Sequence, residues 1–334
     1  MCLSATRAVV LLWLFACGLG LSSAGPADQR PFAELLVAAE KGAALAQRLV
    51  AHAYLTGEGA AKSDSEAVKW LRRAADQQDP VAQYTLGNLY DEGKGVPRDL
   101  AEAVKLYRLA AEQGLADAQY NLAQCYFKGD GVRQDSEQAV EWFRKAAVQG
   151  DAPSQTKLGL AFLSGKGVNR NHAEAASWLR KAAYPPAEDR RAQFFLGRLY
   201  QEGAGVDKDD TTAARWIRKS AQQGDAEAQF HLGQLLLAGR GEATNTVEAR
   251  KWFAQATAQK HEGATKWLTE VNGAPPAPAA ATVAKTNAPA PAVAKADPGL
   301  PTELPWHGSP AALGGAGVAV LLLGWMLMRG KPRV

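Results

Sequence analysis

Cysteine is scarce in this chain, and so is every pattern that would let cysteine build structure. Of the three cysteines in 334 residues, Cys2 and Cys17 lie within the first 24 residues, which leaves Cys125 as the single thiol beyond them. One cysteine cannot form an intrachain disulfide framework. Cys125 stands where other copies of the repeat described below have leucine, which predicts a buried structural thiol. No Asn-x-Ser/Thr glycosylation acceptor occurs either, which disfavours a eukaryotic secretory lumen.

An excess of charge of one sign is missing from most of the chain. The formal net charge of +4 comes from Arg7 and from the residues after Asn272, which hold five basic and two acidic side chains. Residues 25–272 carry 32 basic and 32 acidic side chains. Because no basic stripe is available for a phosphate backbone, we expect no nucleic-acid partner.

Catalytic and metal-ligating patterns are absent as well. No Gly-x-Gly loop of this chain is followed by the Gly-Lys-Ser/Thr of a phosphate-binding loop. No serine has an evident base partner. We therefore expect no metal, no cofactor and no enzymatic activity. The histidines are scattered, without the spacing of metal ligands, at His52, His172, His231, His261 and His307.

Long apolar runs occur only near the two ends. Residues 1–24 carry Arg7, an apolar run and then small residues ending at Ala24, which predicts a cleaved secretory signal peptide. Leu14-Phe15-Ala16-Cys17 also resembles a bacterial lipobox, and in that alternative Cys17 is lipidated.

The C-terminal part of the chain has the composition of a tether. Residues 273–310 hold nine of the seventeen prolines, which predicts a disordered Pro/Ala-rich linker that reaches ~120 Å at ~3.1 Å per residue. Residues 311–328 are uncharged and mostly apolar, which predicts one transmembrane helix. Basic side chains follow at once, so we expect residues 329–334 in the cytoplasm and the preceding chain outside. Gly314-Gly315 keeps open a sorting tail that a protease removes.

The middle of the chain repeats itself six times. Ten residues after a recurring glutamine comes Gly-x-Gly, and the steps between glutamines are 36, 36, 36, 38 and 36 residues. A fixed period of this length predicts stacked helix pairs rather than one closed core. The extra two residues accompany Tyr184-Pro185-Pro186, which must end a helix. The glutamines are Gln47, Gln83, Gln119, Gln155, Gln193 and Gln229.

The second copy, Pro80–Leu115, predicts the structure of one unit. Apolar residues recur at helical spacing before Gly93, a natural helix stop, and again after Asp99. Asp99 and Glu102 have the spacing of a reciprocal capping box, and of the other units only the fifth, with Asp209 and Thr212, departs from it. Residues 32–41 and 263–271 resemble half-units, which predicts caps at both ends of an array over residues 32–271.

These residues resemble a known family. The pattern A-x-A-Q-Y-x-L-G-x-x-Y-x-x-G-x-G-V-x-x-D is similar to the Sel-1-like repeat, a relative of the tetratricopeptide repeat, over about residues 44–262. The resemblance implies an all-α, right-handed α/α solenoid that serves as a scaffold or adaptor, often in bacterial envelopes. Disulfide-rich members have been linked to β-lactam binding, but this chain lacks their paired cysteines.

The resemblance implies that the first helices line a concave binding face. Ten side chains would then be exposed there, and aromatic anchors among polar groups suit peptide recognition. The alternative is that Tyr84, Tyr120, Phe194 and Phe230 pack between adjacent units. The ten candidates are Tyr84, Asn88, Asp91, Tyr120, Gln124, Phe127, Phe194, Arg198, Gln201 and Phe230.

Taken together, the sequence predicts a bacterial envelope protein. Its helical array would lie in the periplasm, anchored to the inner membrane by residues 311–328, and would bind a protein or peptide without catalysis. Two alternatives stay open: an envelope enzyme, such as a cell-wall hydrolase or a β-lactam-reactive protein, and a lumenal adaptor of a degradation complex.

Overall fold

The computed structural model describes residues 30–273. The expected signal peptide, nearly all of the linker, the transmembrane helix and the tail lie outside these residues. The described part contains fourteen α-helices and no strand, and none of its helices is long and apolar enough to cross a membrane. In chain order the helices are α2 (Arg30–Glu40), α3 (Ala44–Thr56), α4 (Asp64–Asp76), α5 (Pro80–Glu92), α6 (Leu100–Glu112), α7 (Ala116–Lys128), α8 (Ser136–Val148), α9 (Ala152–Ser164), α10 (His172–Ala183), α11 (Arg190–Glu202), α12 (Asp210–Gln222), α13 (Ala226–Ala238), α14 (Thr246–Ala258) and α15 (Glu262–Gly273).

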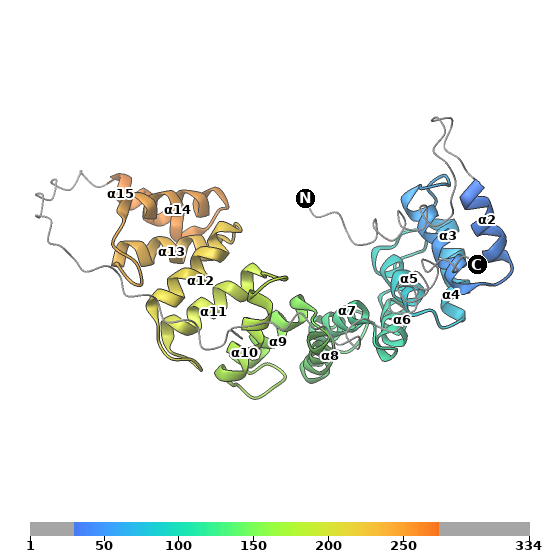
Figure 1. Ribbon diagram of the computed structural model, residues 1–334, viewed down its shortest axis with the longest axis horizontal. Helices are drawn as coiled ribbons and strands as arrows, with labels where there is room; N and C mark the ends of the chain where they lie inside the picture. The colour runs from blue at the N-terminus through green and yellow to red at the C-terminus, as the bar shows by residue number, and fades with distance from the viewer. Residues whose placement is uncertain (1–29, 274–334) are drawn as a thin grey trace, which may run out of the picture. The chain divides into compact units, whose positions relative to one another are not determined.

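The helices form six successive pairs with one further helix at each end (Figure 1). We number the pairs as repeats 1 to 6, from α3/α4 to α13/α14, and call the two members of each pair the first and the second helix. Each helix packs mainly against the helices before and after it in the chain, so α2 covers repeat 1 and α15 covers repeat 6. The predicted all-α helical repeat array is therefore confirmed.

Local sequence signals set the helix ends. All six first helices end at a glycine in the left-handed conformation, such as Gly93 with φ 70°. All six second helices begin with a side-chain cap, as where Asp99 accepts from Glu102 N–H at 3.0 Å. The predicted reciprocal bond is wrong for α6, because the Asp99 N–H donates to the Tyr90 carbonyl instead. Glu102 then pairs with Lys105 at 2.7 Å.

From repeat 2 onward, the second glycine of Gly-x-Gly brings neighbouring repeats together. A Cβ on Gly131 would lie 2.2 Å from the carbonyl oxygen of Leu100, at the start of the preceding repeat's second helix. Gly95, Gly167 and Gly241 meet the preceding second helix in the same way. Only a residue without a side chain fits, so this glycine is required by packing between repeats as well as by its positive φ.

The core runs along the array as linked apolar clusters. Small alanines and one large residue of each second helix pack against the first helix, as with Ala103 and Tyr107 of repeat 2. The outer edges of four tryptophan rings are covered by a cation three residues further on, for example Lys181 with its Nζ 4.0 Å from the centroid of Trp178. The aliphatic stems of these cations shield rings that would otherwise face water.

The repeated glutamines tie each repeat to the one before it. The buried Gln119 donates from Nε2 to the Ala111 carbonyl at 3.0 Å, and its Oε1 accepts from Gln149 at 2.8 Å. Five of the six glutamines make both bonds. The exception is Gln155, because Pro185 stands thirty residues on, where the other repeats have glutamine.

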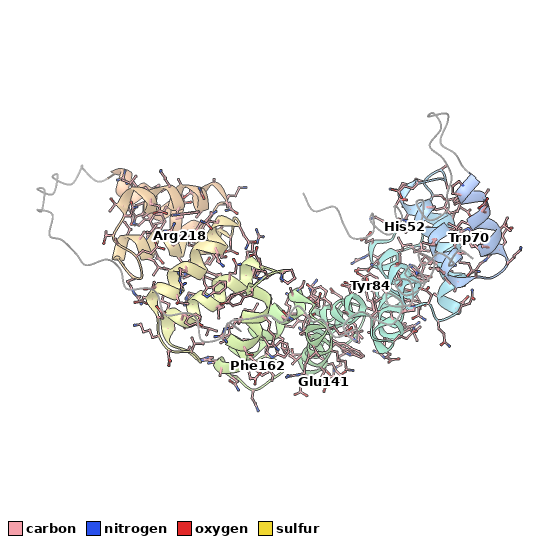
Figure 2. All side chains as sticks on the ribbon, in the orientation of Figure 1. His52, Trp70, Tyr84, Glu141, Phe162 and Arg218 are labelled. Carbon is pink, nitrogen blue, oxygen red and sulfur yellow. The ribbon has the colours of Figure 1, made fainter. Side chains whose placement is uncertain are left out.

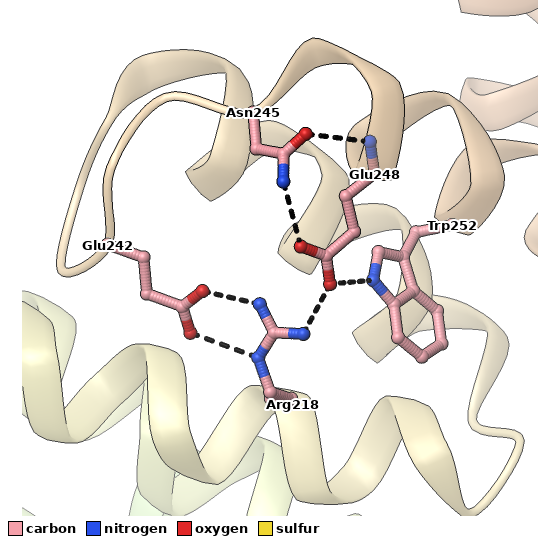
Figure 3. A network of polar contacts seen from close by, with 5 residues as sticks. All are labelled: Arg218, Glu242, Asn245, Glu248 and Trp252. Carbon is pink, nitrogen blue, oxygen red and sulfur yellow. Dashed lines mark hydrogen bonds and ion pairs between the residues drawn. The ribbon is translucent and has the colours of Figure 1, made fainter.

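A charged network joins the last two repeats (Figure 3). The guanidinium of Arg218 in α12 donates to Glu242 in the loop and to Glu248 in α14. Glu248 also accepts from the indole N–H of Trp252, and its backbone N–H donates to Asn245. The bond from Arg218 is the main cause of the lowered pKa of Glu248. Every charge of this network has a partner, so we assign it a structural role.

Candidate functional site

A polar hollow lies between the first helices of repeats 2 and 3. It has a volume of about 360 Å³. Four of the ten predicted site residues line it, Tyr84, Asn88 and Asp91 from α5 and Gln124 from α7, and Figure 2 marks Tyr84 on its helix. Glycine stops and helical spacing place these side chains on one side of their helices. We call the surface formed by the first helices the first-helix face.

Hydrogen bonds hold the floor of the hollow. Asn88 accepts at Oδ1 from the Tyr107 hydroxyl at 2.7 Å and from Asn121 Nδ2 at 3.1 Å. Tyr107 belongs to the second helix of repeat 2, and Asn121 to the first helix of repeat 3. One amide oxygen therefore joins three helices of two repeats and sets the positions of the polar groups around it.

The hollow is lined by three carboxylates, those of Asp91, Glu92 and Asp130, and by one ammonium group, that of Lys128. Asp91 and Asp130 both line it, and both raise the pKa of the Cys125 thiol, although burial is the larger cause of its rise to about 11. Each of these two carboxylates has one long ion pair, Asp91 with Arg98 at 3.6 Å and Asp130 with Lys128, which also lines the hollow, at 3.9 Å. The negative charges are therefore available to a ligand in the hollow.

Cys125 was predicted to be a buried structural thiol, and the structure buries it only in part. The thiol is half-buried: it lines the hollow and also packs against the apolar cluster of α6 and α7. Its raised pKa keeps it protonated at neutral pH, so it is a poor nucleophile.

A cationic surface lies beside the hollow. The ring of Phe127, a predicted site residue, has Lys166 Nζ 4.0 Å and Lys157 Nζ 6.0 Å from its centroid. Tyr120, also predicted, packs its ring 5.8 Å from Phe143, and its hydroxyl accepts from Gln124 Nε2 at 2.9 Å. These contacts leave Phe127 half-buried among positive charges on the first-helix face.

The expected exposure of Phe194 is wrong. Its side chain is 5% exposed, because the rings of Phe195 and His231 cover it at centroid distances of 5.3 Å. Phe230 is half-buried and stacks on His261 at 4.5 Å. Phe194 thus packs between repeats 5 and 6 and Phe230 between repeat 6 and α15, in agreement with the alternative interpretation.

The remaining predicted residues are half-buried on α11. Arg198 pairs with Glu202 one turn further on, and Gln201 lies one turn beyond Arg198. The first-helix face thus carries polar and charged groups at both ends, with the hollow nearer the N-terminal end.

Several residues of this face were missed in the sequence. Tyr107, Asn121, Lys157 and Lys166 all contact predicted residues from another helix or another repeat. The signal was available in the repeat alignment, because Asn121 and Lys157 occupy the same position of successive copies. The sequence does not show which side chains meet across the 19 to 39 residues that separate these partners.

The described residues give little support for a metal site or a catalytic site. Between residues 30 and 273, no three His, Cys, Asp or Glu side chains form a group that could hold a metal ion. Glu227 lies 3.3 Å from His231 and 3.0 Å from His261, but the two rings pack on Phe194 and Phe230. The contact between Glu227 and His261 joins α13 to the start of α15, which is a structural role.

Stacked helix pairs with a polar hollow on one face define an α/α repeat protein of the binding type. The chain belongs to the Sel1 repeat family. The model of the Sel1 repeat matches six segments, which agree with the six helix pairs: residues 44–79, 80–115, 116–151, 152–184, 190–225 and 226–261. Sel1 repeats generally mediate protein–protein interactions without catalysis.

Two solved structures support the same assignment. A protective antigen of uropathogenic Escherichia coli is similar with 38% identity over 71% of this chain and a TM-score of 0.67, and the match spans 50% of that antigen. A Sel1 repeat protein from Oxalobacter formigenes is similar with 33% identity over 67% of this chain, 87% of its own length and a TM-score of 0.61. A search of curated proteins found no match.

Proposed function

We propose that this protein is a non-catalytic scaffold that binds a protein or peptide partner on the first-helix face. The observation that carries the proposal is the hollow between α5 and α7, which four side chains predicted for binding line together. Its polar groups are partly fixed by Asn88, so a partner would meet a preorganised surface. Family membership agrees with this role.

The proposal includes a place in the cell. Residues 1–24 would direct export, residues 273–310 would space the array from the bilayer, and residues 311–328 would anchor it in the inner membrane of a bacterium. The array would then lie in the periplasm and organise an envelope assembly. Only the sequence supports this part, through the apolar runs and the basic residues after position 328.

Site-specific photo-crosslinking tests the binding face. A photoreactive amino acid replaces Asp91 or Lys128, which border the hollow, or Glu141, an exposed residue of α8 on the second-helix side. We expect a discrete adduct of one partner from the first two positions and none from Glu141. Equal adducts from all three positions, or an adduct from Glu141 alone, would contradict the proposed face.

Reporter fusions test the topology separately. A reporter fused after Val334 should be active only in the cytoplasm, and one fused after Asn272 only in the periplasm. The opposite result, or cytoplasmic activity at both positions, would remove the envelope part of the proposal while leaving the binding face untouched.

A further inference from the structure

The first-helix face repeats one three-residue arrangement between successive repeats. We define a junction as a set of three residues from two successive repeats. The first is the eighth residue after the repeated glutamine of one repeat. The other two are the second and the eleventh residue after the glutamine of the next repeat. At the junction of repeats 2 and 3 these residues are Asp91, Asn121 and Asp130, and all three line the polar hollow. This junction offers two carboxylates and an amide.

The next junction has the opposite charge. Between repeats 3 and 4 the same three positions hold Phe127, Lys157 and Lys166, with both ammonium groups near the ring. Within residues 30–273, no carboxylate oxygen lies within 4.0 Å of Lys157, Lys166 or Arg191. The pKa of Lys157 is lowered by its burial and then by the positive charges of Arg191 and Lys128. An anion would relieve this repulsion.

The third junction is apolar. Between repeats 4 and 5 the three positions hold Leu163, Phe195 and Ala204, which are all half-buried and pack against one apolar cluster of α10, α11 and α12. None of the three carries a charge. The edges of these side chains that stay exposed are suited to an aliphatic or aromatic group.

We infer that the first-helix face recognises an extended segment of a partner protein with a basic, an acidic and an apolar side chain in that order, one for each of the three junctions between repeats 2 and 5. The inference rests on the proposed function and adds the chemistry of the partner. Neighbouring first helices meet through their side chains, as where Asn121 donates to Asn88 at 3.1 Å, so their axes lie about 10 Å apart, and an extended chain advances about 3.3 Å per residue. The three side chains are therefore expected at intervals of about three residues.

Synthetic peptides test this order with the full chain, purified in a mild detergent. Four fluorescein-labelled peptides in an Ala/Ser background carry Lys, Glu and Leu three residues apart. Two have Glu in the middle, in either chain direction, and two have Lys there. We expect at least one Glu-centred peptide to bind about tenfold more tightly than both Lys-centred peptides by fluorescence polarisation, a difference of about 1.4 kcal/mol.

Charge-reversal variants locate the effect. In K157E/K166E both charged junctions are acidic, so the preference between Glu-centred and Lys-centred peptides should be lost, and in R250E/K251E, which changes the same charge on α14, it should stay as in the wild type. D91K/D130K should weaken the Glu-centred peptides about tenfold. Circular dichroism and thermal unfolding check that each variant is folded.

The inference is overturned by any of three results. The peptides bind without regard to order, K157E/K166E keeps the wild-type preference, or no peptide binds at all. The photo-crosslinking at Asp91 and Lys128 distinguishes these failures from a failure of the proposed function, because it detects a partner of any chemistry.

Discussion

Gln113, which ends α6, donates its side-chain amide to the Oε1 of Gln83 in α5 at 2.8 Å. Gln83 in turn donates to the Ala75 carbonyl in the preceding repeat. A single buried side chain thus links two helices of its own repeat and the last turn of the repeat before it. The same pair of hydrogen bonds recurs along the array. It holds neighbouring repeats together wherever a second glutamine stands thirty residues after the first.

In the fourth repeat Gln155 has no glutamine partner, so the contribution of the bond between two glutamines to stability can be measured by comparison. Gln119→Leu removes two hydrogen bonds, while the Ala111 carbonyl keeps the bond from the Gly114 N–H, and should lower the free energy of unfolding by about 2 kcal/mol. Gln155→Leu is the matched control, since Gln155 makes the carbonyl bond but has no glutamine partner. Urea unfolding should show a loss of free energy of unfolding about 1 kcal/mol smaller for Gln155→Leu than for Gln119→Leu. Equal losses would show that the bond between the two glutamines contributes nothing.

The second loop glycine gives a prediction about packing between repeats. Gly131→Ala introduces a Cβ 2.2 Å from the Leu100 carbonyl oxygen and should destabilise the protein by about 3 kcal/mol or more. Gly150→Ala has an even more positive φ, 94°, with nothing within 4 Å of the new Cβ. Its cost should be about 1 kcal/mol, from backbone strain alone. Comparison of the two variants by thermal unfolding separates the cost of the steric contact from the cost of backbone strain.

The lowered pKa of His231 predicts that the protein loses stability in mild acid. Burial is the main cause of its lowered pKa, and Arg198 and His261 act in the same direction, against Glu227. Since the unfolded chain then binds the proton more readily, stability should fall as pH drops below about 6.5, histidine's ordinary pKa, and level off below the folded value.

Replacement of His231 separates this effect from other acid effects. In His231→Gln the fall in melting temperature between pH 7.5 and 5.5 should be smaller than in the wild type. His172→Gln, an exposed substitution at the start of α10, should leave that fall unchanged. An identical pH profile for the wild type and His231→Gln would refute the assignment.

Cys125 provides a direct probe of the hollow. With Cys2 and Cys17 replaced by serine, alkylation of the native protein at pH 8 should be about a hundredfold slower than in urea, because the folded thiol has a pKa of about 11. The native rate should keep rising up to that pH. A peptide bound in the hollow should slow it further, and a native rate equal to the unfolded rate would contradict the site as described.

Much of this fold was predictable because its signals are local. The glycine that ends each first helix, the side-chain caps of the second helices and the apolar spacing act within a few residues of where they stand. All six copies of the repeat carry these same local signals. The candidate site was predicted only in part, since helical spacing indicates the face a side chain occupies and not the atoms that face it.

Phe194 and Asn88 illustrate the difference. Both lie on the predicted face, yet Phe194 is covered by His231, 37 positions away, while Asn88 is held by Asn121, 33 positions away. The burial of each depends on the residue that the next repeat contributes. No local pattern contains that information.

The sequence by itself determined that the chain is a stack of helix pairs, because the conformations of glycine and of the capping residues are properties of the chain nearby. Tertiary structure decided where Gly-x-Gly must lack a side chain, which glutamines form pairs, and that carboxylates, lysines and apolar groups follow one another along the first-helix face. These features depend on contacts between repeats. They exist only after the helices have stacked.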